Sequence, residues 1–272
     1  MLEYVKIFKY NPLKTTYTKE NLQGVVMDVY DRMADLYDFI YSGDFDLDFY
    51  EEEAKKAKGP ILEVGCGTGR VMLELIKKGI AVDGLDISKE MLRILKNKAR
   101  MMGYSPRLYH ADMRDFSLKK KYSLIIVPYR SFLHLSTDED RLASLKKMNS
   151  HLRKGGKIML HLYVPSEDEI TTANEFRPID CDSFTIGSRK FHTFWYMKYS
   201  EKGKRADYLI ELHEGDKKIK EFKMEIYFVP YAAMKKMLKK AGFKKIVAYA
   251  DFSDKTFLPD EGAKEVIWVA EK

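Results

Sequence analysis

The chain has 272 residues, of which 45% are hydrophobic and 33% charged, and its 48 Lys and Arg exceed its 41 Asp and Glu to give a net charge of +7. This length fits one large domain, or one domain with an insert, that is stable through its own core. No stretch approaches the roughly 20 apolar residues of a membrane helix, and the first ten residues lack the apolar centre of a signal peptide. We therefore expect a cytoplasmic protein with no membrane partner. Cys66 and Cys181 are the only cysteines, so the sequence has neither a disulfide framework nor zinc-ligand spacing, and no metal is expected.

The positive charge is dispersed along the sequence. Lysines occur as doublets among Glu and Asp, as at 55–56, 146–147 and 239–240, and the longest run is 119–121. A nucleic-acid groove would gather such residues on one face. We therefore favour a small-molecule partner, while a nucleic acid stays possible. A Lys- and Glu-rich composition with a single Gln is also typical of heat-adapted proteins.

The predicted elements alternate between strands and helices after an N-terminal segment, 1–58, that we interpret as a helical lid. Within it, 1–28 has no clear period, whereas 29–58 is aromatic and acidic with partly helical spacing. Residues 59–164 alternate apolar strands with amphipathic helices, which predicts a doubly wound, mostly parallel α/β core. Strands are expected at 61–64, 81–85, 107–109, 124–127 and 157–163, and helices at 70–78, 88–102 (with Ser88 as N-cap) and 138–152.

Residues 165–230 do not continue this alternation of strands and helices, and they predict an antiparallel β-meander inserted over the substrate site. Its three expected strands, at 190–200, 205–214 and 217–229, are separated by turn residues. The first strand is apolar on both faces, which predicts burial on both sides, against the core and against either the substrate or a second subunit. Residues 231–272 complete the core with a helix and the last two of seven strands, which we expect at 231–240, 243–250 and 266–270.

The stretch from Glu63 to Gly69, Glu-Val-Gly-Cys-Gly-Thr-Gly, ends a predicted strand and opens a helix. Glycines there let the backbone approach a ligand, and the helix N-terminus offers free N–H groups. A dinucleotide fingerprint would need a glycine where Arg70 stands, and a P-loop would need Gly-Lys-Ser or Gly-Lys-Thr. The pattern Glu-x-Gly-x-Gly-x-Gly matches in full.

That pattern resembles motif I of class I S-adenosylmethionine (SAM)-dependent methyltransferases, which implies a Rossmann-like fold. Asp86 ends the second strand, where a carboxylate can accept both ribose hydroxyls. Asp112 and Met113 follow the third strand, where the family holds the adenine. The resemblance implies SAM as cofactor and S-adenosyl-L-homocysteine as product. The residues it assigns to the cofactor are Tyr30, Tyr37, Glu63, Gly65, Cys66, Gly67, Gly69, Asp86, Ile87, Asp112, Met113 and Tyr129.

The resemblance extends to the segment after the fourth strand, Tyr-Arg-Ser-Phe-Leu-His-Leu at 129–135. It is similar to the Asn-Ser-Phe-x-His-Leu stretch of glycine N-methyltransferases, with Arg130 in the Asn position. The tyrosines at 30, 37 and 41 resemble the N-terminal tyrosines of those enzymes and of amino-sugar N,N-dimethyltransferases. Because Arg130 departs from the family residue, glycine itself is not favoured as the acceptor.

Methyl transfer to an amine requires that the nitrogen lone pair be held behind the methyl group and that a proton leave. His134 is our first candidate as base or orienting group, and a buried His satisfied by its neighbours is the alternative reading. Tyr30 and Tyr41 are the further catalytic candidates, because aromatic faces attract sulfonium and ammonium groups alike. The candidate substrate contacts are Arg130, Tyr163, Arg177 and Tyr227.

The sequence thus predicts a SAM-dependent methyltransferase that acts on a small molecule, with an amine nitrogen as the favoured acceptor. Two alternatives stay open. One is an RNA methyltransferase of the cap-like guanine-N7 or tRNA type, and the other is a non-catalytic SAM-binding protein. Methylation of oxygen rather than nitrogen also stays open, as do a monomer and a homodimer.

Overall fold

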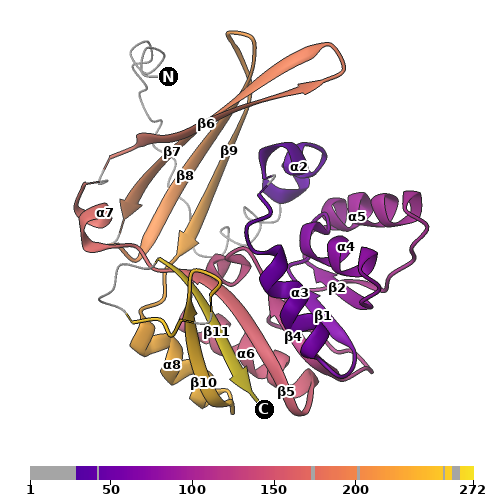
Figure 1. Ribbon diagram of the computed structural model, residues 1–272. Helices are drawn as coiled ribbons and strands as arrows, with labels where there is room; N and C mark the ends of the chain where they lie inside the picture. The colour runs from indigo at the N-terminus through magenta and orange to yellow at the C-terminus, as the bar shows by residue number, and fades with distance from the viewer. Residues whose placement is uncertain (1–28, 42, 173–174, 201–202, 254, 259–263) are drawn as a thin grey trace.

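A seven-stranded sheet forms the centre of the protein, in the order β10-β11-β5-β4-β1-β2-β3. The computed structural model describes residues 29–272 except 42, 173–174, 201–202, 254 and 259–263, so the first 28 residues of the expected lid lie outside the described chain (Figure 1). Neighbouring strands from β3 to β5 are parallel, and β11 alone runs against them. The strands are β1 (Ile61–Val64), β2 (Val82–Asp86), β3 (Leu108–His110), β4 (Tyr122–Val127), β5 (Leu152–Tyr163), β10 (Lys244–Ala250) and β11 (Glu265–Glu271). The predicted mostly parallel, seven-stranded α/β fold is confirmed.

Helices cover both faces of this sheet, as the alternation of its side chains requires. Ile61, Leu124 and Ile126 pack with one group of helices, whereas Leu62 and Ile125 pack with the other. The first group is α3 (Leu47–Lys56), α4 (Arg70–Lys77) and α5 (Lys89–Met101); the second is α6 (Asp138–His151) and α8 (Tyr231–Lys240) (Figure 1). No helix in the described residues is long and apolar enough to cross a membrane.

The expected helices are present with small shifts at their ends. The side chain of Ser88 accepts a hydrogen bond from the Met91 backbone N–H at 3.1 Å, so it caps α5 as predicted. Strand β5 begins at Leu152, five residues before the predicted start, because the chain continues along β4 through Gly155, whose φ is +74°. The register between β4 and β5 shifts between Tyr122 and Leu124, and this irregularity accommodates the extra residues.

A separate antiparallel sheet stands above the central one, in the order β6-β7-β8-β9. Its strands are β6 (Arg177–Ile186), β7 (Arg189–Ser200), β8 (Arg205–Glu214) and β9 (Lys217–Tyr227), and α7 (Glu167–Thr172) precedes them. The expected meander is therefore present, but with an additional strand, β6. That strand escaped prediction because it is a mostly exposed edge strand with no regular alternation of apolar and polar residues.

The expectation that the first meander strand is buried on both faces is wrong. In β7 the residues Phe191, Trp195 and Met197 are buried, whereas Phe194 and Tyr196 between them are only half-buried. The fully buried face of this strand packs on the N-terminal segment and on the core, and the aromatic residues of the other face tolerate partial exposure because of their size.

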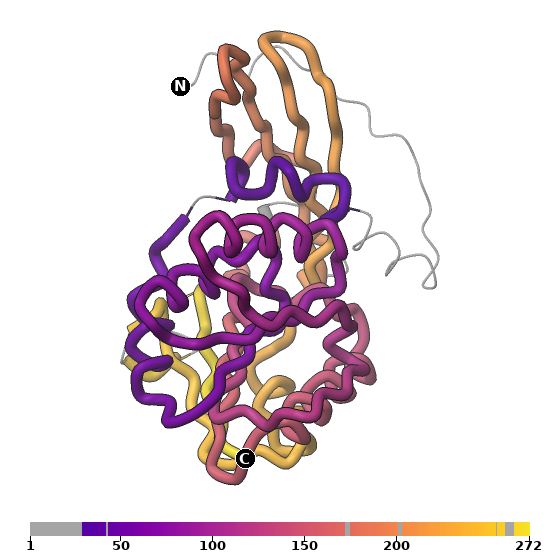
Figure 2. Tube along the Cα trace, turned by 90° about the vertical axis from the view of Figure 1, so that its right-hand side faces the viewer, coloured from indigo at the N-terminus to yellow at the C-terminus, as the bar shows by residue number. Residues whose placement is uncertain are grey.

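The part of the N-terminal segment from 29 to 41 lies between the two sheets (Figures 1 and 2). It is helical over 29–33, followed by η2 (Ala34–Leu36) and α2 (Tyr37–Ile40). Val29 and Met33 pack with Phe222 of the upper sheet and Met91 of α5. Its carboxylates also bind the core: Asp31 accepts from Ser88 Oγ, and Asp38 accepts from Thr68 Oγ1, both at 2.5 Å. The segment therefore joins the upper sheet to the edge of the central sheet where β1 and β2 end.

A buried ion pair fixes the start of α4 against the loop before α3. Arg70 donates from its two terminal nitrogens to Asp46, at 2.5 and 2.7 Å, and the Asp46 side chain is fully buried. The same guanidinium lies 4.8 Å from the centre of the Tyr129 ring. Because a buried charge that loses its partner is costly, this pair is important for folding.

We expect Asp46→Asn to lower the free energy of unfolding by about 3 kcal/mol, because it leaves the Arg70 charge unpaired inside the protein. Chemical denaturation followed by circular dichroism measures this change. Glu74→Gln is the control, since Glu74 pairs with Lys77 on the surface and such exposed pairs are worth under about 1 kcal/mol. Equal losses in the two variants would contradict the assignment.

Candidate functional site

The loop between β1 and α4 bends at three glycines with positive φ, namely Gly65 (+74°), Gly67 (+52°) and Gly69 (+90°). A Cβ on Gly65 would lie 2.8 Å from the Ser131 side chain, and one on Gly69 would lie 2.2 Å from Leu95. A Cβ on Gly67 would meet nothing within 4 Å. The loop thus packs closely at two glycines and presents its backbone to open space at the third.

Asp86, at the end of β2, binds this loop. Its carboxylate accepts hydrogen bonds from the backbone N–H groups of Gly67 at 2.7 Å and Ser88 at 2.8 Å. Burial raises the pKa of Asp86 above its usual value, although these N–H groups oppose that effect. A carboxylate has about four acceptor positions, so Asp86 keeps acceptor capacity for a ligand.

A cavity of about 80 Å³ lies beside Asp86. Five residues predicted to bind the cofactor line it, from the glycine loop and from the ends of β2 and β3. The complete lining is Gly65, Leu85, Asp86, Ile87, Ala111, Asp112, Met113, Arg114, His134 and Leu135. The structure therefore brings together the glycine loop, the ribose candidate and the adenine candidates at one edge of the sheet.

Asp112 already has a strong partner within the protein. Arg114 donates to both of its carboxylate oxygens, at 2.5 to 3.0 Å, and reaches Asp140 at 3.2 Å. Burial would raise the pKa of Asp112, but the bonds from Arg114 outweigh it and lower that pKa below its usual value. Asp112 is therefore a charged acceptor that Arg114 holds in place, and its contact with adenine stays a prediction.

Glu63 and Cys66 do not line the cavity beside Asp86. Glu63 is 1% exposed and Cys66 is 3% exposed. Burial raises the pKa of the Glu63 carboxyl and of the Cys66 thiol well above their usual values. Their burial under the loop is consistent with a supporting role, and the direct cofactor contacts assigned to them and to Gly67 and Gly69 stay predictions.

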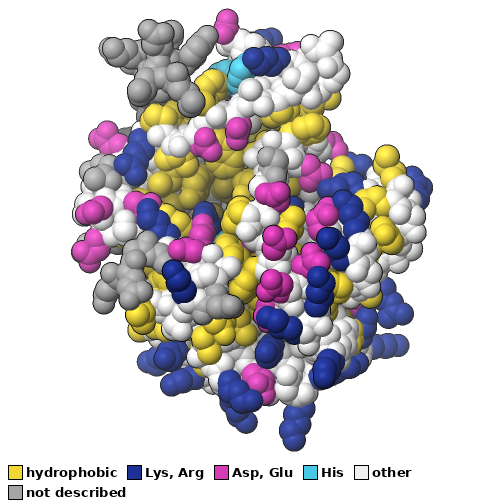
Figure 3. All heavy atoms as spheres, viewed as in Figure 1, with side chains coloured by type: hydrophobic (Ala, Val, Ile, Leu, Met, Phe, Trp, Pro, Cys, Tyr) yellow, Lys and Arg dark blue, Asp and Glu magenta, His cyan; other side chains and the backbone are white. Residues whose placement is uncertain are grey.

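A larger cavity of about 330 Å³ opens between the N-terminal segment, the upper sheet and the loop after β4. This volume lies within the range of roughly 300–1,000 Å³ that is usual for small-molecule sites. Hydrophobic side chains gather on the face where the upper sheet overhangs the core (Figure 3). The cavity is lined by Tyr30, Tyr37, Ile40, Tyr41, Gly43, Tyr129, Arg130, His134, Ile179, Asp180, Asp182, Trp195, Tyr208, Met224 and Ile226. We call this the acceptor pocket.

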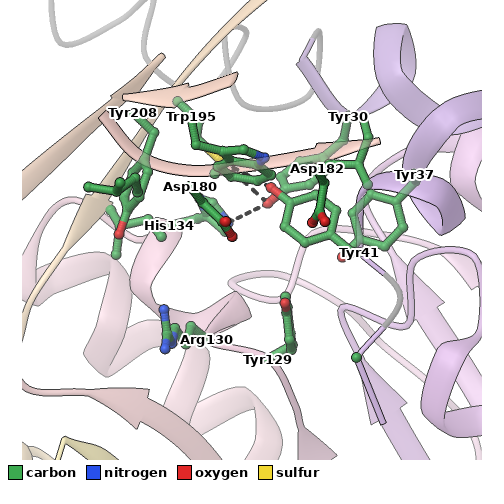
Figure 4. A pocket seen from close by; sticks show the side chains of 15 residues that line it. Tyr30, Tyr37, Tyr41, Tyr129, Arg130, His134, Asp180, Asp182, Trp195 and Tyr208 are labelled. Atoms are coloured by element: carbon green, nitrogen blue, oxygen red, sulfur yellow. Dashed lines mark hydrogen bonds between the residues drawn. The ribbon is translucent and has the colours of Figure 1, made fainter. Parts of the chain in front are cut away.

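Four tyrosines that were predicted as site residues, Tyr30, Tyr37, Tyr41 and Tyr129, meet in the acceptor pocket (Figure 4). The ring centres of Tyr37 and Tyr41 are 4.6 Å apart, and those of Tyr41 and Tyr129 are 5.7 Å apart. Trp195, which the sequence analysis did not select as a site residue, meets Tyr41 edge-on at 5.3 Å. Burial raises the pKa of Tyr30, Tyr37 and Tyr41, so these walls stay uncharged.

His134 stands between the two cavities and lines both. It belongs to a short 3₁₀ helix, η3 (Ser131–His134), and its Nε2 lies 2.8 Å from the hydroxyl of Tyr30 (Figure 4). Burial lowers the pKa of His134 to about 4, with the backbone of Glu225 offsetting part of that effect. An imidazole of this pKa is neutral and too weak a base to deprotonate an ammonium group, so the geometry favours orientation over general base catalysis.

Arg130 also lines the acceptor pocket, but its guanidinium has a partner within the protein. It donates to the carboxylate of Glu265 through both Nε and a terminal nitrogen, and it lies 4.4 Å from the centre of the Tyr163 ring. Glu265 also pairs with Nε2 of His161 at 2.7 Å. Tyr129 and Arg130 have positive φ values of 51° and 64°, a strained pair that marks this loop. The Arg130 guanidinium, which we predicted as a substrate contact, is therefore already paired with a carboxylate.

The remaining candidate substrate contacts lie outside the acceptor pocket as described. Tyr163 donates to Glu169 at 2.8 Å, and the Tyr227 hydroxyl binds Glu225. Arg177 begins β6 and does not line the pocket. Asp180 and Asp182 line the acceptor pocket but were not predicted as site residues. The signal for them was the Asp-x-Asp pattern, which places two carboxylates on one face of a strand.

Residues 61–156 match the family described as "Methyltransferase domain". This part of the chain is similar to a methyltransferase domain. The dTDP-3-amino-3,6-dideoxy-alpha-D-glucopyranose N,N-dimethyltransferase of Streptomyces fradiae is 30% identical over 50% of this chain and 55% of its own length. The glycine/sarcosine N-methyltransferase of Halorhodospira halochloris is 31% identical over 53% of each chain. The chain thus spans about half the length of these relatives.

Solved structures extend the likeness to almost the whole fold. The CcbJ methyltransferase of Streptomyces caelestis superposes with a TM-score of 0.74 at 21% identity, covering 89% of this chain and 97% of the other. The sugar N-methyltransferase KedS8 of a Streptoalloteichus species gives 0.69 at 15% identity, covering 97% and 99%. At such identities the likeness concerns the fold alone, and together with the domain match it confirms the resemblance to class I methyltransferases.

The methyltransferase domain contains the glycine loop, Asp86, Asp112 and His134, but little of the acceptor pocket. Only Tyr129, Arg130 and His134 of the pocket lie within 61–156. The other described lining residues come from the N-terminal segment and from the upper sheet. The cavity beside Asp86 thus lies within the matched residues, whereas most of the acceptor pocket is built by flanking parts of this chain.

We expect the His134 side chain to titrate with a midpoint near pH 4, because the pocket disfavours the charged imidazole. A nuclear magnetic resonance titration of the histidine Cε1–H signals measures this midpoint, and His134→Gln identifies the signal by its loss. A midpoint near the usual histidine value of about 6.5 would show that the ring is solvated.

Proposed function

We propose that this protein transfers the methyl group of SAM to an amine nitrogen of a small molecule. The observation that carries the proposal is the position of His134, which lines both the cavity beside Asp86 and the acceptor pocket. A methyl group must pass directly from one ligand to the other, so the two ligands must meet at one point. His134 and its partner Tyr30 mark that point.

The residues around Asp86 fit SAM. Asp86 has free acceptor positions for ribose hydroxyls, Asp112 and Met113 line the far side of the same cavity, and Gly67 leaves open space above its backbone. The aromatic faces of Tyr30 and Tyr37 suit a sulfonium group. When bound, SAM supplies an electrophilic methyl group.

The chain's own residues bind and orient the amine. The Tyr30 hydroxyl oxygen can accept a hydrogen bond from an amine N–H, which turns the nitrogen lone pair toward the cofactor. Nε2 of neutral His134 lies 2.8 Å from that hydroxyl and holds it in place. Loss of solvent around the amine at this buried point, together with the like charge of a neighbouring sulfonium, disfavours the ammonium form and raises the fraction of the reactive neutral amine. The N-methyltransferase names of the relatives support nitrogen as the acceptor atom.

A label-transfer assay tests the proposal. The protein is incubated with methyl-labelled SAM and a cell extract, which is then separated into metabolite, protein and RNA fractions. We expect label in the metabolite fraction, where mass spectrometry identifies the methylated amine. Label in RNA would instead support a nucleic-acid methyltransferase, and SAM binding without any transfer would support a non-catalytic protein.

Asp86→Asn should weaken SAM binding at least about tenfold, because an amide accepts hydrogen bonds less strongly than a carboxylate and one of its groups only donates. Isothermal titration calorimetry measures the dissociation constant. Asp115→Asn is the matched control, since Asp115 is exposed and pairs with Lys147 outside the cavity. Unchanged affinity in Asp86→Asn would remove Asp86 from the cofactor site.

Tyr30→Phe and His134→Ala should each lower kcat for the amine found in the label-transfer assay by about 10²-fold, because the orientation of the nitrogen is lost. The SAM dissociation constant should stay within about threefold, since neither side chain is needed to bind the nucleoside. Tyr104→Phe, at an exposed tyrosine, controls for loss of a hydroxyl. Simultaneous loss of turnover and SAM affinity would mean that the pair supports the fold instead.

A further inference from the structure

Two carboxylates form part of the acceptor pocket wall opposite the loop after β4. Asp180 and Asp182 stand two residues apart on β6, so they share one face of that strand, and both project into the pocket (Figure 4). They are paired across the sheet with Trp195 and Thr193 of β7. Both residues are exposed to solvent as well as facing the pocket, so they carry little burial cost and remain available to a ligand that enters.

No cation of the described pocket neutralises this pair. Arg130 is the only Lys or Arg among the described lining residues, and Glu265 already engages its guanidinium. Within the described chain, Asp180 accepts a hydrogen bond only from the Cys181 backbone N–H, at 2.9 Å, and Asp182 has no ion-pair partner. The pocket therefore offers two negative charges to whatever enters it.

The charge of the wall and the chemistry of the reaction favour different places for two nitrogen atoms. A carboxylate stabilises the ammonium form of a nearby amine, and an ammonium nitrogen has no lone pair for attack. The reacting nitrogen is therefore better placed beside the uncharged His134 and Tyr30. A nitrogen that stays charged is better placed against Asp180 and Asp182.

We propose that the acceptor is a di- or polyamine-type molecule, whose second, non-reacting ammonium group binds Asp180 and Asp182, and that it carries no anionic group. This inference rests on the proposed methyl transfer to an amine and deepens it. The rings of Tyr41, Trp195 and Tyr208 line the same pocket and suit the carbon chain and the cation alike. An amine that also carries a carboxylate or phosphate would be repelled by Asp180 and Asp182. The described walls offer it no unpaired cation in compensation, since Arg130 is paired with Glu265.

A matched panel of small amines tests this inference by binding, independently of catalysis. The panel consists of linear α,ω-diamines of about three to six carbons, the amino alcohols of the same lengths and the corresponding ω-amino acids. Each is titrated calorimetrically into the protein saturated with S-adenosyl-L-homocysteine. At the best chain length, we expect the diamine to bind at least about tenfold more tightly than the amino alcohol, and the amino acid to bind most weakly.

The variants Asp180→Asn, Asp182→Asn and their double variant assign the preference to these carboxylates. We expect the double variant to bind diamine and amino alcohol within about twofold of each other, because only the ion pairing has been removed. Asp216→Asn is the matched control, since it removes one charge from the exposed β8–β9 turn of the same sheet. It should keep the full preference, and all variants should bind S-adenosyl-L-homocysteine as the unmodified protein does.

Three results would overturn the inference: tighter binding of the amino acids, an unchanged diamine preference in the double variant, or no measurable diamine binding at any length. Failure of the proposed function gives a different pattern. In that case the diamine preference follows Asp180 and Asp182, yet methyl-labelled SAM transfers no label to any amine of the panel.

Discussion

The edge of the central sheet where parallel strands end determines the positions of the candidate cofactor residues and of His134. Parallel strands present their carboxyl ends together, and the loops that follow them carry free backbone N–H groups. Here the carboxylate of Asp86 accepts hydrogen bonds from the backbone N–H groups of Gly67 and Ser88. The end of β2 therefore holds the loop that follows β1. This contact fixes one cavity, and the η3 turn after β4 adds His134 to the same edge. The upper sheet and the N-terminal segment then close over it.

Burial assigns different charges to the two ends of the acceptor pocket. Around His134 and Tyr30 it opposes ionisation, so the imidazole, with its pKa lowered to about 4, and the phenol are both neutral. At β6, an exposed edge strand, carboxylates remain in contact with solvent as well as with the pocket. One pocket is thus lined both by neutral groups, suited to a nucleophile, and by carboxylates, suited to a cation. Neither property follows from residue type alone, because both depend on what surrounds each group.

The sequence was sufficient to predict what depends on local pattern. Apolar runs and helical spacing gave the seven strands and the helices between them, and the Glu-x-Gly-x-Gly-x-Gly pattern located the glycine loop. His134 and the tyrosines at 30, 41 and 129 followed from a family resemblance, and the structure brings them into one pocket. The sequence was not sufficient for long-range partners. The pairing of Arg130 with Glu265 joins residues 135 positions apart. Strand β6 has no regular apolar pattern, because backbone pairing with β7 holds this exposed edge strand in the sheet.

The division between the methyltransferase domain and its additions explains why acceptor chemistry is hard to transfer from relatives. The matched residues, 61–156, include the glycine loop and Asp86, whereas Asp180, Asp182 and Trp195 lie on strands outside them. A change of acceptor therefore requires no change in the cofactor half of the site. It requires only a different set of side chains on the upper sheet, where β6 is exposed and tolerates substitution. Under the proposed di- or polyamine specificity, the two carboxylates on that strand are the residues that select the acceptor.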